Sequence, residues 1–191
     1  MSEFDALLRA LQSIPGAADN GIKKGLKRAA VIVMGRAKNK LGTYQGSSGS
    51  FNAWAKLNPE TVRKKHLSKS GSGRLSKAGK AYLQKHSSWG TGTNDDAPLV
   101  DTGHLRQAIT TDYSDLDSHR VAYVGVAAGR NTAGKGSPSD YAAKHEFGDV
   151  SRRIPARPYL RPALEESRAQ IKEEVSKALV QELRGLGRGG L

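Results

Sequence analysis

The chain has 191 residues, no cysteine and a formal net charge of +13. This length suits one domain with extended parts, and the lack of cysteine excludes disulfides and thiolate metal sites. Hydrophobic residues make up 37% of the chain, below the usual share of about 45–50% that includes glycine, so we expect part of it to pack against partners or stay loose. No signal peptide or membrane-length apolar run is evident, so cytoplasmic synthesis without membrane contact is predicted.

The positive charge lies in the first half of the chain. Residues 1–90 contain 17 Lys or Arg and 4 Asp or Glu, whereas residues 91–191 contain 14 of each kind. A basic surface of this kind attracts DNA, RNA or an acidic protein, and a solvated basic face is the plainer alternative. The candidate basic patch consists of Lys23, Lys24, Lys27, Arg28, Arg36, Lys38 and Lys40.

Two helices are predicted in the first forty residues. Apolar residues at helical spacing cover 4–14, and Pro15-Gly16 is expected to end that helix. A second helix is predicted over 18–40, with one apolar side, one basic face and Gly42 as its stop. This second helix is therefore both packed and basic.

Residues 42–97 are rich in Gly, Ser and Lys and have few apolar anchors, which predicts a basic arm or mobile loop. Short helices are predicted from Asn58 to about 66 and over 77–85. Trp54 and Leu57 are the candidate residues that anchor the arm on the domain. Trp54 with Trp89 and neighbouring lysines is also compatible with stacking on nucleic-acid bases.

The second half predicts short elements followed by one long helix. The predicted elements are a helix over 105–108 capped by Asp101 or Thr102, antiparallel strands over 109–113 and 120–127 joined by a polar turn, a helix over 141–147, an edge strand over 153–160, and a helix from 162 to about 183. Residues 185–191 are flexible by composition. The predicted class is α+β: long helices packed on a small, mostly antiparallel sheet, with long loops or arms, in a single domain over 1–191.

The most informative stretch runs from Tyr141 to Leu164. It reads Tyr-Ala-Ala-Lys-His-Glu-Phe-Gly and, a few residues on, Arg-Ile-Pro-Ala-Arg-Pro-Tyr-Leu-Arg-Pro-Ala-Leu. Tyr141 and His145 form an i,i+4 pair on a short helix that Gly148 is placed to cap. Three prolines then hold residues 155–162 stiff and extended. A stiff segment between two helices presents an edge of the kind that a docking surface needs.

This stretch resembles the tail-completion and virion-morphogenesis proteins of tailed bacteriophages, with Tyr159 in place of the usual Phe. Upstream residues are similar to the Mu-type members of that family: Trp54, Leu57, Pro59, Thr61, Lys65 and the run Pro98-Leu-Val-Asp-Thr-Gly-His-Leu-Arg106. The resemblance implies a virion protein of the tail or neck that forms a ring, most simply a homo-hexamer. Such a ring would contact the tail tube or sheath protein and the head–tail connector protein. The resemblance also implies non-specific contact with genomic DNA in the lumen of the ring.

Within this reading, the candidate subunit or partner interface combines the helix and the stiff segment. Its residues are Tyr141, His145, Glu146, Phe147, Arg157, Tyr159 and Arg161. Arg and Tyr are typical interface anchors. The alternative for the two arginines is ordinary pairing with Glu146 or Asp149. For His145, a hydrogen bond beneath the proline segment is expected.

Catalytic signatures are weak. Asp101-Thr102-Gly103 resembles the triplet of retroviral-type aspartic proteases, but the residues after it favour a helix start, so a helix cap is the preferred interpretation. His145-Glu146 lacks the second histidine of a zinc helix, because position 149 is Asp. We therefore predict no enzyme, catalytic residue, metal or cofactor. The alternatives are a basic nucleic-acid-binding protein and, less favoured, the protease.

Overall fold

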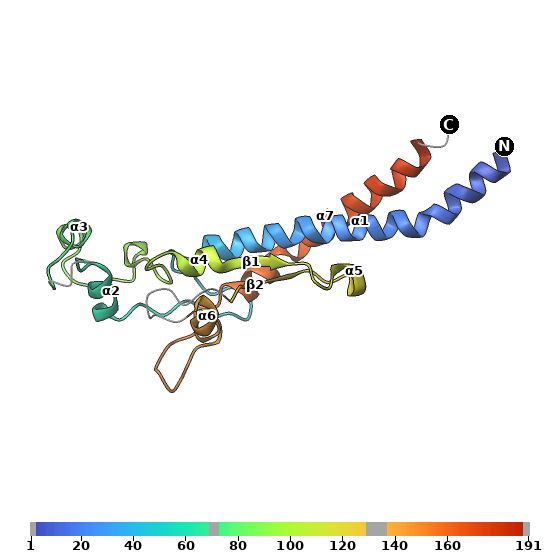
Figure 1. The fold of residues 1–191 in the computed structure, drawn as a ribbon. Coiled ribbons are helices and arrows are strands. Elements are labelled where there is room, and N and C mark those ends of the chain that lie inside the picture. The colour runs from blue at the N-terminus through green and yellow to red at the C-terminus, as the bar shows by residue number, and fades with distance from the viewer. Residues whose placement is uncertain (1–2, 69–72, 129–136, 189–191) are drawn as a thin grey trace. The chain divides into compact units, whose positions relative to one another are not determined.

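The computed structural model describes residues 3–68, 73–128 and 137–188, and Figure 1 shows their helices and strands. Contacts within the chain divide it into two units. One unit is formed by residues 1–35, 110–125 and 163–191, and the other by residues 36–109 and 126–162. The prediction of a single domain stays a prediction, and each unit is described by itself below.

The first unit begins with helix α1, which runs from Glu3 to Lys40 with Pro15 inside it. The prediction that Pro15-Gly16 ends a first helix is therefore wrong. An interior proline costs about 3 kcal/mol, but ending the helix there would leave up to eight backbone groups to be satisfied elsewhere. Gly42, in contrast, lies just beyond the end of α1 with a φ of +93°, as the predicted stop requires.

Helix α7, Leu160–Arg188, packs against α1 in the first unit through two glycines. A Cβ at Gly21 would lie 2.7 Å from Cα of Leu179, and one at Gly25 would lie 2.5 Å from Cα of Val175. Only glycine permits so close an approach of two helix backbones. Because α7 continues to Arg188, the predicted flexible tail is wrong for 185–188, and 189–191 lie outside the described residues.

The sheet has two strands, β1 over Ile109–Asp112 and β2 over Tyr123–Val126. Their connection contains the short helix α5, Leu116–His119, where a simple polar turn was predicted. Helix α4, His104–Ala108, precedes β1 and starts at Gly103 with a φ of +81° and no side-chain cap. The predicted cap by Asp101 or Thr102 is therefore wrong, whereas the α+β class with long helices and an antiparallel sheet is confirmed.

Within the second unit, the described residues of the segment predicted as an arm, 42–68 and 73–97, are folded. It contains helices α2, Pro59–Lys65, and α3, Lys77–Lys85, and the 3-10 turn η1, Asn94–Asp96. Asn58 caps α2 by accepting a hydrogen bond from the backbone of Glu60, as predicted. Buried apolar side chains hold the segment together, namely Leu57, Val62 and Tyr82, with Tyr44 and Trp89 packed against them. A polar segment folds here because this small cluster is completed by buried hydrogen bonds, described below.

The last part of the second unit is helix α6, Pro138–Phe147, and the chain that leads to α7. Gly148 follows α6 with a φ of +83°, in agreement with the predicted helix end. No strand forms over 153–160, all of which the structure describes, so the predicted edge strand is wrong. A single antiparallel bridge joins Asp149 to Ile154. The prolines that follow lack the N–H groups that a longer ladder would use.

Candidate functional site

The carboxylate of Glu146 organises the stretch from Tyr141 to Leu164. Glu146 is buried near the end of α6, and its oxygens accept hydrogen bonds from the backbone nitrogens of Tyr159 at 2.7 Å, Leu160 at 3.0 Å and Arg161 at 3.0 Å. Arg161 also donates through Nε at 3.1 Å, so one of the two predicted arginine pairings is present. The first N–H groups of a helix have no partner within the helix. Glu146 therefore caps α7 from a distant position.

Arg157 and Tyr159 lie inside the chain, which contradicts the prediction that they enter a neighbouring subunit. Tyr159 is 0% exposed, and its hydroxyl has no hydrogen-bond partner among the residues that the structure describes. Arg157 is 4% exposed, and its guanidinium donates to the carbonyl oxygens of Ala55 at 3.0 Å and Lys56 at 3.2 Å. The physical reason differs for the two residues: the Arg157 guanidinium is buried because backbone carbonyls accept its N–H groups, whereas the Tyr159 ring is buried as a large apolar body.

Trp54 and Leu57 are buried in the same unit. The indole nitrogen of Trp54 donates to the carbonyl oxygen of Pro158 at 3.1 Å. This placement joins the 42–97 segment to the proline segment, as the predicted anchor would. It also places the indole out of reach of nucleic-acid bases, so base stacking by Trp54 is not available in this fold.

An exposed aromatic surface remains beside this buried framework. Phe147 is 64% exposed, and the guanidinium carbon of Arg161 lies 4.5 Å from its ring centroid and 5.4 Å from that of Phe51. Val150 is 95% exposed. A cavity of about 270 Å³ adjoins these rings, lined by residues that include Ala142, Ala143, Phe147, Leu160 and Arg161. We call Phe51, Phe147 and Arg161 the Phe147 surface; of the predicted interface residues, Phe147 and Arg161 belong to it.

Tyr141 and His145 form the predicted i,i+4 contact, with ring centroids 6.1 Å apart. The backbone carbonyl of His145 accepts from the backbone nitrogen of Arg157 at 2.6 Å, but the buried Nδ1 of the ring has no partner within residues 3–68, 73–128 and 137–188. The expected hydrogen bond beneath the proline segment is thus made by the main chain. Burial, with Arg157 and Lys65 nearby, lowers the pKa of the His145 side chain.

The predicted basic patch lies along α1, and part of its charge is neutralised by carboxylates. Lys23 pairs with Asp19 at 2.9 Å and with Asp117 at 2.8 Å, and Lys24 pairs with Glu182 at 2.7 Å. These contacts hold the pKa of Lys23 above its usual value, mainly through the hydrogen bond to Asp117. Of the other members, Lys27 lies 5.7 Å from the ring centroid of Tyr113, and Lys40 donates to Gln45. Arg28 is exposed, whereas Arg36 and Lys38 are half-buried.

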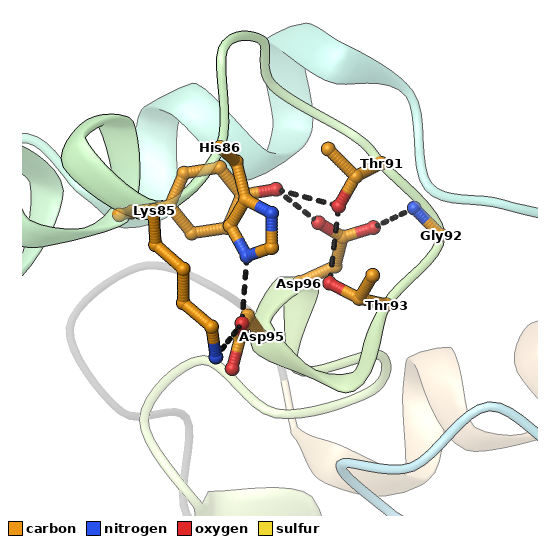
Figure 2. A network of polar contacts seen from close by, with 8 residues as sticks. Lys85, His86, Thr91, Gly92, Thr93, Asp95 and Asp96 are labelled. Atoms are coloured by element: carbon orange, nitrogen blue, oxygen red, sulfur yellow. Dashed lines mark hydrogen bonds and ion pairs between the residues drawn. The ribbon is translucent and has the colours of Figure 1, made fainter.

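A buried carboxylate network inside the 42–97 segment was missed by sequence reasoning. Asp96 is 0% exposed and accepts from the hydroxyl of Tyr82 at 2.5 Å, the hydroxyl of Tyr44 at 3.0 Å and the backbone nitrogen of Gly92 at 2.8 Å. Figure 2 shows the part of this network around Gly92 and Asp96, beside the contacts of Asp95 with Lys85 and His86. The signal available in the sequence was only a pair of acidic residues in a basic, glycine-rich segment, which is too weak to separate Asp96 from Asp95.

The residues behind the other chemical alternatives do not assemble a reaction centre. Asp101 is exposed and is followed by α4 within three residues, an arrangement unlike the paired carboxylates of an aspartic protease. Among the described residues, no three His, Asp or Glu side chains gather to hold a metal ion. None of the helices in the described part of the chain combines the length and apolar character that crossing a bilayer requires. Comparisons of this chain with protein families, with curated proteins and with solved structures found no match.

Proposed function

We propose that this chain is a structural virion protein that forms a ring, most simply of six copies, at the tail end or neck of a tailed bacteriophage. The ring completes the tail and joins it to the head connector. The observation that carries the proposal is the Phe147 surface, which leaves an aromatic ring 64% exposed on a framework fixed by the buried Glu146. The sequence resemblance to tail-completion proteins supports the same class.

A closed ring needs a heterologous interface, in which one patch of a subunit meets a different patch of the next. Val150 is a protruding apolar side chain, and the cavity lined by Ala142, Ala143 and Phe147 is an apolar hollow. A projection and a hollow on one chain provide two complementary patches. Phe147 stacked on Arg161 supplies the aromatic and arginine anchor typical of the centre of an interface.

The basic face of α1 suits a second partner in this assembly. Lys23 and Lys24 are already paired with carboxylates of the same chain. The exposed Lys27 and Arg28 are the members of the patch best placed to meet an acidic neighbour or DNA in the lumen. Such a contact weakens as the salt concentration rises.

Electron microscopy of the purified protein, alone and mixed with tail tubes, tests the proposal. We expect rings, and rings on tube ends in the mixture. Phe147→Ser should yield monomers by light scattering, whereas Leu83→Ser, which changes a 37% exposed apolar residue on α3, should assemble normally. A wild-type protein that stays monomeric at all concentrations and binds DNA with a steep salt dependence would instead identify a nucleic-acid-binding protein.

A further inference from the structure

A second cavity lies within the unit formed by 36–109 and 126–162, away from the Phe147 surface. Its volume is about 310 Å³, within the range of small-molecule sites. It is lined by parts of the chain that are distant in sequence: the end of α2 with Lys65, the 99–105 stretch, Tyr141 and His145 on α6, and Arg157. We call it the Lys65 pocket.

The polar groups of the Lys65 pocket are mainly donors. Lys65 donates through Nζ to the carbonyl oxygens of Asp96 at 3.1 Å and Ala97 at 2.6 Å, which uses two of the three N–H groups of an ammonium. Arg157 uses Nε and Nη2 on the carbonyls of Ala55 and Lys56, so the N–H groups of Nη1 have no partner among the described residues. The buried Nδ1 of His145 has no hydrogen-bond partner in the described part of the chain, and it donates only in the tautomer that is protonated there.

The charge of this pocket is positive. Lys65 and Arg157 contribute two cations. Among the described residues that line the pocket, Asp101 is the one carboxylate, and it also interacts with another group of the chain. Burial lowers the pKa of Lys65 to about 8, since nearby Asp101 and Asp96 offset the burial only in part. Buried cations that have too few anionic neighbours lower the stability of the folded protein, and a bound anion raises that stability again.

The rest of the lining is apolar and includes Leu57, Leu99, Val100 and Leu105. A bare inorganic anion would leave these side chains without contact, because the cavity is several times larger than such an ion. A carboxylate has two oxygens that accept up to four hydrogen bonds, which suits the third N–H of Lys65 and the N–H groups of Arg157 Nη1, left over from their bonds to backbone carbonyls.

From these contacts we infer that the Lys65 pocket binds a carboxylate attached to an aliphatic group, supplied either by a free acid or by the end of a peptide. The cationic side chains hold the carboxylate, and the leucines and valine cover the aliphatic part. Neither Phe147 nor Val150 lines the pocket, so this inference does not depend on ring assembly.

Calorimetric titration with N-acetyl-leucine tests this site, and N-acetyl-leucinamide, which has the same shape and no charge, is the matched ligand control. The acid should bind at least about tenfold more tightly than the amide, because hydrogen bonds to a charged group are worth about 1.5–3 kcal/mol. Lys65→Met should lose about tenfold in affinity for the acid. Lys64→Met, on the exposed face of the same helix, should bind as the wild type does.

A short peptide ending in leucine, with a free or an amidated carboxyl group, distinguishes the two sources. Tighter binding of the free-ended peptide than of N-acetyl-leucine assigns the site to a chain end, and the reverse assigns it to a free acid. Equal binding of acid and amide would overturn the inference, as would unchanged affinity in Lys65→Met or no binding of any acid. The acid–amide comparison uses the wild-type protein, so it stands even if a variant fails to fold.

Discussion

The carboxylate of Glu146 accepts a hydrogen bond of 2.7 Å from the backbone nitrogen of Tyr159, which is thirteen residues further along the chain. Through this contact the end of α6 supplies a hydrogen-bond acceptor for backbone N–H groups at the beginning of α7, which have no acceptor within their own helix. The proline segment between the two helices is thereby held at both ends, since Arg157 binds the carbonyls of Ala55 and Lys56 as well. The stretch from Tyr141 to Leu164 is thus first a structural clamp, whereas the ring of Phe147 lies 64% exposed beside Arg161.

Replacing Glu146 by Ala should destabilise the protein by about 3 kcal/mol, because three backbone N–H groups and the Arg161 guanidinium lose their acceptor. Urea unfolding followed by circular dichroism measures this loss, and faster hydrogen exchange at the amides of Tyr159 and Leu160 localises it. Glu165→Gln removes an exposed partner of Arg168 and should leave the unfolding midpoint unchanged. Equal midpoints for the two variants would contradict the capping role.

Replacing Asp96 by Asn should cost about 2 kcal/mol, because an amide offers one acceptor where the carboxylate accepts from Tyr44, Tyr82 and Gly92. The effect should be confined to the 42–97 segment. Tryptophan fluorescence during urea unfolding detects it through Trp89, which packs on the buried cluster. Asp95→Asn, which alters the exposed contacts with Lys85 and His86, is the control and should unfold like the wild type.

Substituting Gly25 by Ala should destabilise the α1–α7 pair by about 2 kcal/mol, because the added Cβ would lie 2.5 Å from Cα of Val175. Gly35→Ala on the same helix is the matched control, since nothing lies within 4 Å of its added Cβ. That variant should gain about 0.5–1 kcal/mol from better helix propensity. The midpoint temperature of unfolding should therefore fall in Gly25→Ala and rise in Gly35→Ala. A loss of stability of equal size in both variants would show that close packing is not the cause.

The lowered pKa of His145 predicts that the protein loses stability in acid. The unfolded chain takes up this proton near pH 6.5, whereas the folded chain does so only at lower pH. Below pH 6.5 the unfolded state therefore binds more protons, and the free energy of unfolding falls until the folded pKa is passed. Above pH 6.5 this contribution is constant.

His145→Gln should flatten the pH profile of the unfolding free energy between pH 6.5 and the acid limit, measured by urea titrations at several pH values. His66, whose pKa is lowered mainly by burial, contributes a remaining slope of the same sign. Val180→Gln changes an exposed residue that has no titratable group and is expected to keep the wild-type profile. An unaltered slope in His145→Gln would refute the assignment to this residue.

Local signals in the sequence predicted the elements whose ends are determined by nearby residues. Asn58 caps α2, Gly42 follows α1, Gly148 follows α6, and the helix over 77–85 has its predicted bounds. These predictions succeed because a cap or a positive φ depends on residues within one turn. Pro15 is one exception, since the continuity of α1 outweighs the local cost of one proline.

Only the tertiary structure decided which polar side chains are buried and which remain exposed. The sequence singled out Glu146, Phe147, Arg157, Tyr159 and Arg161 as one group, but Arg157 and Tyr159 lie inside the chain while Phe147 is exposed. The partners of Arg157 stand about a hundred residues away, at Ala55 and Lys56. Hydrogen bonds across such separations depend on how the chain folds back on itself, and no local pattern encodes them.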